Sequence, residues 1–103
     1  MKMWREQIQD IYYKTLAQFN LAVVTFYNNL AHPEKAVTLD HVSETMSHFD
    51  FTMSQINQMM NSFLEPNSQQ ILQIPSWLNL DQLINTCKSL FHRLKPKVEA
   101  LPP

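Results

Sequence analysis

A regular stripe of apolar residues runs through positions 39–63 of the chain. Its members alternate between spacings of three and four residues: Leu39, Val42, Met46, Phe49, Met53, Ile56, Met60 and Phe63. A period of about 3.5 residues predicts a helix that carries a narrow apolar seam along its whole length. Because exposure of this seam to water is unfavourable, we expect the helix to lie along other helices.

The composition agrees with a helical chain. Globular proteins contain about 7% glycine, whereas these 103 residues include none. Tight hairpin turns and phosphate-binding loops depend on glycine, so both are disfavoured. A chain of this length forms one domain and buries roughly two thirds of the surface of its unfolded state. We therefore expect a single all-α domain over residues 1–103.

Three helices are predicted, at about 2–31, 38–64 and 79–95, with linkers at 32–37 and 65–78 and a short tail at 96–103. The first helix ends before Pro33, since the residue before a proline disfavours helical geometry. Asn79 is expected to cap the third helix in a capping box with Gln82, and Pro96 is expected to end it. The expected fold is an antiparallel three-helix bundle with long first and second helices, which dimerisation would complete to a larger bundle.

The first predicted helix is apolar over about two thirds of its circumference. Beside the residues expected in the core, it carries a second apolar set: Tyr13, Leu21, Val24 and Tyr27. A helix that is apolar on two sides is the centre of a bundle or contacts a second chain. It is also longer, at about 45 Å, than the third helix, at about 24 Å. Either the segment 71–77 or a second copy of the chain has to cover the remainder, and the two-sided first helix leads us to expect a homodimer.

A partner interface is predicted for five residues: Tyr13, Val24, Tyr27, Phe51 and Trp77. Phe51 lies opposite the seam on its helix, where it would join exposed aromatic residues of the first helix in an apolar patch. The methionines of the seam have two interpretations. They fill an ordinary core, or they line an adaptable groove, because methionine packs against varied partners.

No catalytic, cofactor-binding or metal-binding residues are predicted. His41, Glu44 and His48 share a helical face, but the two histidines are seven residues apart. That spacing corresponds to about 10 Å along the helix axis, which is too far for both to bind one ion. Cys87 falls in an apolar stripe and is expected to be an inert core residue. Walker and Rossmann loops need glycine, and a His-Glu-x-x-His motif does not occur.

The charge balance disfavours nucleic acid as a partner. The formal net charge is −1, whereas binding to a phosphate backbone requires a strongly basic surface. One basic group is present in the third predicted helix: Lys88, Arg93, Lys95 and Lys97. Cations near a helix C-terminus complement the helix dipole, which is the simpler interpretation of this group.

The sequence thus favours a non-catalytic helical module for protein–protein interaction, such as an adaptor, a regulator or an assembly subunit. The alternative is a peripheral protein whose amphipathic helices bind lipid or other hydrophobic particle surfaces. Such helices usually carry Lys and Arg on their polar faces, whereas the first helix offers mainly Gln, Asp and Asn beside Lys14. No signal peptide or transmembrane segment is evident, so we expect a cytoplasmic location.

Overall fold

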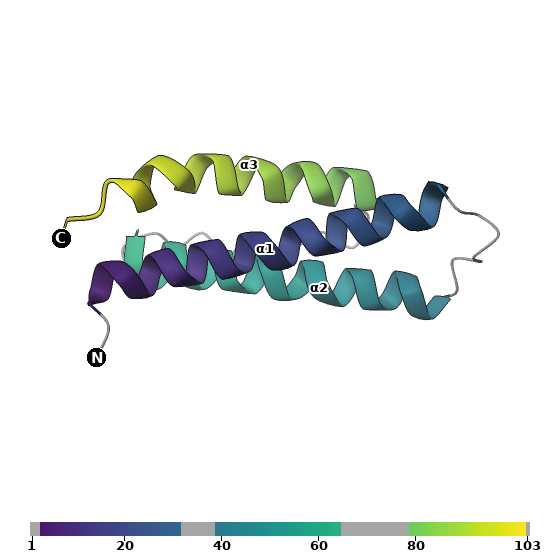
Figure 1. The fold of residues 1–103 in the computed structure, drawn as a ribbon, viewed down its shortest axis with the longest axis horizontal. Coiled ribbons are helices and arrows are strands. Elements are labelled where there is room, and N and C mark those ends of the chain that lie inside the picture. Colours follow the sequence, from purple (N-terminus) through teal and green to yellow (C-terminus); the bar gives the residue numbers. More distant parts are fainter. Residues whose placement is uncertain (1–2, 32–38, 65–78, 103) are drawn as a thin grey trace.

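The computed structural model describes residues 3–31, 39–64 and 79–102. Its helices are α1 (Trp4–Ala31), α2 (Leu39–Gln58), the π-helical segment η1 (Met59–Leu64), which continues α2, and α3 (Leu80–Glu99). No strand occurs in the described residues. The helices pack lengthwise against one another (Figure 1). The principal-axis extents are 50 × 26 × 21 Å. The all-α three-helix bundle expected from the sequence is confirmed.

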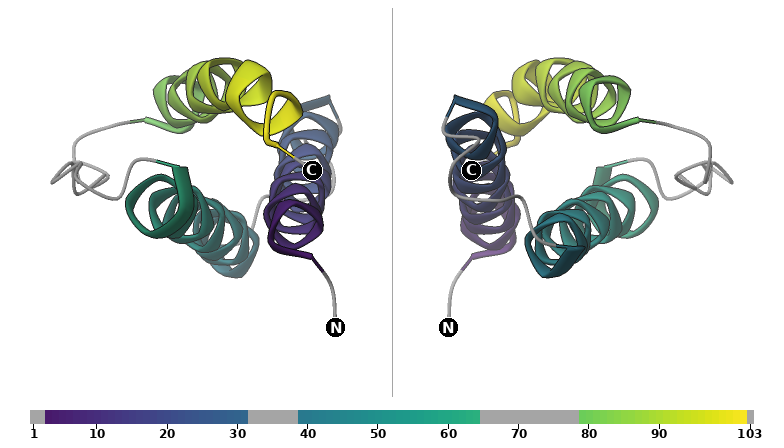
Figure 2. Two further views of the ribbon diagram at one scale, coloured as in Figure 1. Left: turned by 90° about the vertical axis from the view of Figure 1, so that its left-hand side faces the viewer. Right: turned by 90° about the vertical axis from the view of Figure 1, so that its right-hand side faces the viewer.

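The helices differ in direction. α1 runs antiparallel to both of its neighbours, whereas α2 and α3 run the same way (Figure 1, Figure 2). Side-chain contacts give the same directions, because Met53 and Met60 of α2 and η1 contact Cys87 and Arg93 of α3 in the same order. The antiparallel packing expected from the sequence therefore holds for α1 against each neighbour. The linker 65–78 between the two parallel helices lies outside the described residues.

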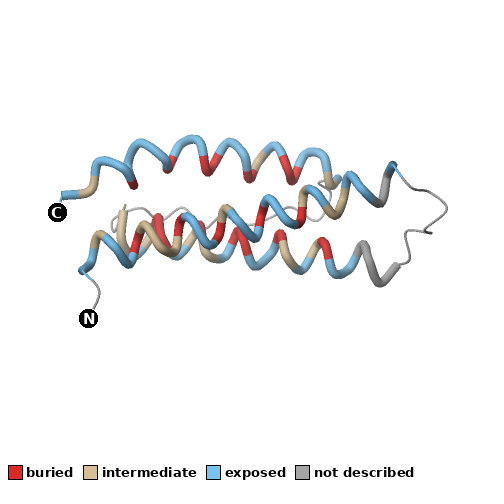
Figure 3. The backbone as a smooth tube through the Cα atoms, in the orientation of Figure 1, coloured by how far each residue is buried: buried red, intermediate tan, exposed pale blue. Residues whose placement is uncertain are grey.

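The core lies where the three helices face one another (Figure 3). From the seam, four residues are buried: Phe49, Met53, Ile56 and Met60. Met46 and Phe63 are partly buried against the same cluster, and the side chains of Leu39 and Val42 lie outside the described part of the chain. α1 contributes Ile8, Tyr12, Phe19 and Ala22 to the buried cluster. α3 contributes Leu83, Ile84, Cys87, Leu90, Phe91, Leu94 and Val98.

Phe19 of α1 connects the three helices. Its ring centroid lies 5.8 Å from that of Phe49 in α2 and 5.4 Å from that of Phe91 in α3. Tilted aromatic pairs at such distances contribute about 0.5–1.5 kcal/mol each beyond the burial of their surface. This cluster fixes the rotation of α1 in the bundle, and it thereby decides which residues of α1 remain on the outside.

The prediction that Pro96 ends the third helix is wrong. α3 continues to Glu99, and Pro96 lies exposed within its last turns. A proline inside a helix removes a backbone hydrogen bond and costs about 3 kcal/mol. Two interactions offset part of this cost, because Val98 is fully buried and the N–H of Ala100 donates to the Pro96 carbonyl at 3.1 Å. Residues 96–99 therefore belong to the bundle, although the sequence assigns them to a tail.

The second helix changes its geometry near its end. Residues 59–64 form the π-helical segment η1, so the single helix predicted over 38–64 is α2 followed by η1. The wider turn of a π-helix changes which side chains share a face. Met59 and Met60 are both fully buried here. Of these two neighbours, the seam predicted from the sequence contains Met60 and not Met59.

Small side chains lie between α1 and α2. Thr45 of α2 lines a hollow between the two helices together with Ala22 of α1, and both residues are buried. Thr52 is also buried, and its hydroxyl donates to the His48 carbonyl at 2.9 Å. This bond within the helix satisfies the hydroxyl without a partner from another helix. Residues of this size leave a shallow groove along the outside of the α1–α2 junction.

Candidate interaction surface on α1 and α2

α1 presents apolar side chains to solvent on the side away from the core. Five residues make up this outer face: Tyr13, Ala17, Leu21, Val24 and Tyr27. Their spacings of three and four residues place them on one side of the helix over about 21 Å. The four large side chains among them are 47–58% exposed. Several exposed large apolar side chains along one side of a helix are typical of a surface that contacts another molecule.

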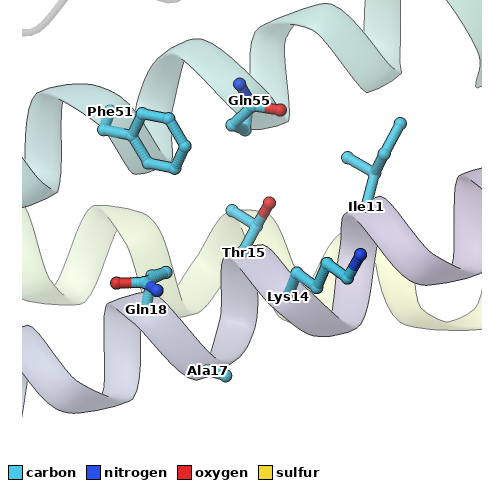
Figure 4. Close-up of a pocket in the computed structure, with 7 residues that line it drawn as sticks. All are labelled: Ile11, Lys14, Thr15, Ala17, Gln18, Phe51 and Gln55. Atoms are coloured by element: carbon cyan, nitrogen blue, oxygen red, sulfur yellow. The ribbon is translucent and has the colours of Figure 1, made fainter.

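A groove follows the α1–α2 junction beside the outer face. Its first hollow has a volume of about 390 Å³ and is lined by Ile11, Lys14, Thr15, Ala17, Gln18, Phe51 and Gln55 (Figure 4). Its second hollow has a volume of about 260 Å³ and is lined by Leu21, Ala22, Thr25, Glu44, Thr45 and His48. We name the two hollows together the outer groove, because they follow each other between the same two helices. Ala17 and Leu21 belong to both the outer face and the groove, so the two form one surface.

Phe51 projects from α2 over the first hollow toward α1 (Figure 4). Its side chain is 52% exposed, whereas Phe49, two residues earlier, is fully buried. The difference follows from helical geometry, since residues two positions apart point to nearly opposite sides of a helix. Phe51 therefore offers a partner a large and rigid apolar surface at the edge of a hollow.

The predicted interface residues fall into distinct places. Three of them lie together on the outer face: Tyr13, Val24 and Tyr27. Phe51 lies beside the outer groove, and Trp77 lies outside the described residues. The structure adds Leu21, which is 58% exposed and also lines the second hollow. The second apolar set of the first helix already contains Leu21, but only the position of α2 reveals that it joins the outer face to the groove.

Cys87 is held in the core, where burial disfavours its thiolate form. Its side chain is fully buried, and its Sγ lies 3.5 Å from Sδ of Met53. Burial raises the pKa of the Cys87 thiol from 9.0 to about 12. The thiol, which is a far weaker nucleophile than the thiolate, is therefore the form present near pH 7.

Two of the three residues considered as metal ligands lie near each other in the described structure. Glu44 and His48 both line the second hollow, and the side chain of His41 lies outside the described part. Among the described residues, no group of three or more His, Cys, Asp or Glu side chains lies close enough to hold a metal ion. The described helices also include none that is long and apolar enough to cross a membrane.

The basic residues of α3 lie on two sides of the helix. Three basic side chains line a third hollow, of about 240 Å³, between α1 and α3: Lys88, His92 and Lys95. The aromatic residues beneath them, Tyr12, Phe19 and Phe91, are buried. Nη2 of Arg93 lies 3.3 Å from Sδ of Met60 instead. The outer face and the outer groove are the better candidate for a binding surface, because they include exposed large apolar side chains that the third hollow lacks.

Comparison with models of protein families, with curated proteins and with solved structures finds no significant match.

Proposed function

We propose that this chain is a non-catalytic helical module for protein–protein interaction, such as an adaptor, a regulator or an assembly subunit. It binds its partner through the outer face and the outer groove. The observation that carries the proposal is the exposure of four large apolar side chains on one side of α1, beside a groove with the half-exposed Phe51. A partner surface that covers them removes this apolar area from water, which favours association. The proposal includes a cytoplasmic location.

The free energy gained by covering the exposed side chains indicates how much apolar surface the partner must add. Burial of a fully exposed large apolar side chain contributes about 1.5–3 kcal/mol, so covering four half-exposed ones contributes about 3–6 kcal/mol. Association itself costs about 4–15 kcal/mol. The outer face alone offsets at most the lower end of this cost, so stable binding also requires an apolar face on the partner that fills the outer groove. A helix with apolar residues three and four positions apart meets both requirements.

The lining of the first hollow favours binding over catalysis, whereas the second hollow also contains Glu44 and His48. The first hollow is lined by apolar, amide and hydroxyl side chains, with Lys14 as its charged member. Such a lining can hold another side chain, whereas general acid–base catalysis uses a positioned titratable pair. The thiol of Cys87 is buried away from this groove, which also favours a binding role.

Site-specific photo-crosslinking in the native host tests the proposal. A photoreactive phenylalanine analogue replaces Val24 on the outer face, and the same analogue replaces the exposed Asn85 of α3 as the matched control. We expect the analogue at position 24 to crosslink to a protein and give adducts of discrete mass. We expect no such adduct from position 85. Helical circular dichroism of both variants shows whether the bundle is intact.

Two results would contradict the proposal. One is the absence of a protein adduct from position 24 in a folded variant, and the other is the same set of adducts from both positions. A chain that floats with phosphatidylcholine–phosphatidylserine vesicles and gives no protein adduct would replace the proposal with the lipid-binding alternative.

A further inference from the structure

We infer that the outer groove is occupied by a second copy of this chain, with the two α1 helices antiparallel and Lys14 of each copy against the partner's Glu44. This inference rests on the proposed function and specifies its partner. The evidence comes from the charges along the groove and from the positions of its apolar residues.

The outer groove carries opposite charges toward its two ends. Lys14 lines the first hollow, whereas Glu44 lines the second, next to His48. Thr25 of α1 also lines the second hollow. The two charges are therefore separated along the bundle by the distance from residue 14 to residues 21–25 of α1, which is about 10–16 Å.

One kind of twofold symmetry brings the positive end of the groove in one copy opposite the negative end of the groove in the other copy. Consider a twofold axis that is perpendicular to the helices and crosses the groove at the level of residues 19 and 20 of α1. The second copy that this axis generates runs in the opposite direction. Because Lys14 and Glu44 lie at similar distances on either side of that level, each Lys14 then faces the partner's Glu44. An axis parallel to the helices would instead place like charges at the same level, which is unfavourable. The antiparallel pairing is isologous, so it closes at a dimer.

The same axis matches the apolar residues of the two copies. Phe51 lies at the level of residues 15–18, with which it lines the first hollow. The symmetry brings that level opposite the partner's Leu21 and the partner's Val24. Ala17 lies near the centre of the face, where its small side chain permits close approach of the two α1 helices. Phe51, Leu21 and Val24 thereby meet apolar surface of the second copy, as the energetic requirement of the proposed function demands.

A charge exchange measured by sedimentation equilibrium tests this arrangement. The variants are Lys14→Glu, Glu44→Lys and the double exchange Lys14→Glu/Glu44→Lys. An exposed ion pair is worth about 0.2–1 kcal/mol and occurs twice in the dimer, so loss of both pairs is expected to raise the dimer dissociation constant about 2- to 30-fold. The double exchange restores the attraction and is expected to return the constant to within about threefold of the original. Lys88→Glu, which makes the same charge change on α3, is the matched control and should leave the constant unchanged.

The outcomes separate this inference from the proposed function. A double exchange as weak as the single variants, or single variants without effect, would overturn the antiparallel pairing. A chain that stays monomeric but gives an adduct with a different protein from position 24 would overturn the second copy and leave the proposed function standing. The absence of any protein adduct from position 24 would contradict both the dimer and the proposed function. Circular dichroism of each variant shows whether a weakened dimer reflects loss of the fold.

Discussion

The hydroxyl of Tyr12 in α1 donates a hydrogen bond to the backbone carbonyl of Phe91 in α3, at 3.3 Å. The same two residues meet with their rings edge to face, at a centroid distance of 5.7 Å. Tyr12 is buried, so its polar group would be unsatisfied without this acceptor. The bond fixes the axial position of α3 against α1, and it explains how a tyrosine can belong to the core.

Tyr12→Phe removes the donor and keeps the ring. We expect the free energy of unfolding to fall by about 0.5–1.5 kcal/mol, because a net hydrogen bond of this kind is lost while the packing remains. Chemical denaturation followed by circular dichroism measures the change. Tyr13→Phe is the matched control, since Tyr13 is half exposed. Equal effects of the two substitutions would show that the Tyr12 hydroxyl does not stabilise the fold.

Val98→Ala tests whether the helix beyond Pro96 is part of the core. Val98 is fully buried, so loss of two methyl groups and the resulting cavity should lower the free energy of unfolding by about 1–3 kcal/mol. Glu99→Ala, at an exposed position next to it, should change it by less than about 0.5 kcal/mol. If the chain after Pro96 were an unpacked tail, both substitutions would be neutral.

Cys87 should resist thiol reagents in the folded protein. Its full burial and a pKa raised to about 12 leave little thiolate near pH 8. We expect labelling by iodoacetamide at pH 8 to be very slow in buffer and complete in concentrated guanidinium chloride, as followed by mass spectrometry. Rapid labelling without denaturant would contradict the buried position of Cys87.

The same thiol should make the fold less stable at high pH. The pKa of Cys87 rises from 9.0 to about 12 on folding because of burial. The unfolded chain therefore loses this proton first, and the contribution to stability is fully present below pH 9 and declines as the pH rises toward 12. Its slope is about 1.4 kcal/mol per pH unit in that range. Because burial also raises the pKa of Tyr12, the comparison is made with Cys87→Ala, whose stability should depend less steeply on pH over this range.

Local rules predicted the elements of this fold well. The spacing of the seam gave the buried side of α2, since a period near 3.5 residues corresponds to one face of a helix. The capping box at the start of α3 is confirmed: the Asn79 side chain accepts from the N–H of Gln82 at 2.8 Å, and the Gln82 side chain accepts from the N–H of Asn79 at 3.3 Å. Both features depend on residues within one or two turns of each other.

Features that depend on the arrangement of helices were beyond local rules. Pro96 disfavours a helix locally, and only the burial of Val98 in the assembled core explains why α3 continues. Thr52 is polar, yet its bond to a carbonyl of its own helix makes it suitable for the core. The role of Leu21 depends in the same way on α2, which supplies the other side of the outer groove. The sequence identifies apolar residues, but the neighbours of a helix decide which of them stay exposed.

Phe49→Ala and Phe51→Ala compare two phenylalanines of α2 that differ strongly in burial. Phe49 is fully buried against Phe19, so its truncation should cost about 3–5 kcal/mol of unfolding free energy. Phe51 is half exposed beside the outer groove, and its truncation should cost less than about 1 kcal/mol in a monomeric sample at low concentration. Thermal and chemical denaturation measure both values. At concentrations where the chain associates, Phe51→Ala should also raise the dissociation constant, because it removes an apolar surface that the outer groove offers a partner. A large loss of monomer stability from Phe51→Ala would show that this ring belongs to the core and that the interaction surface is smaller than proposed.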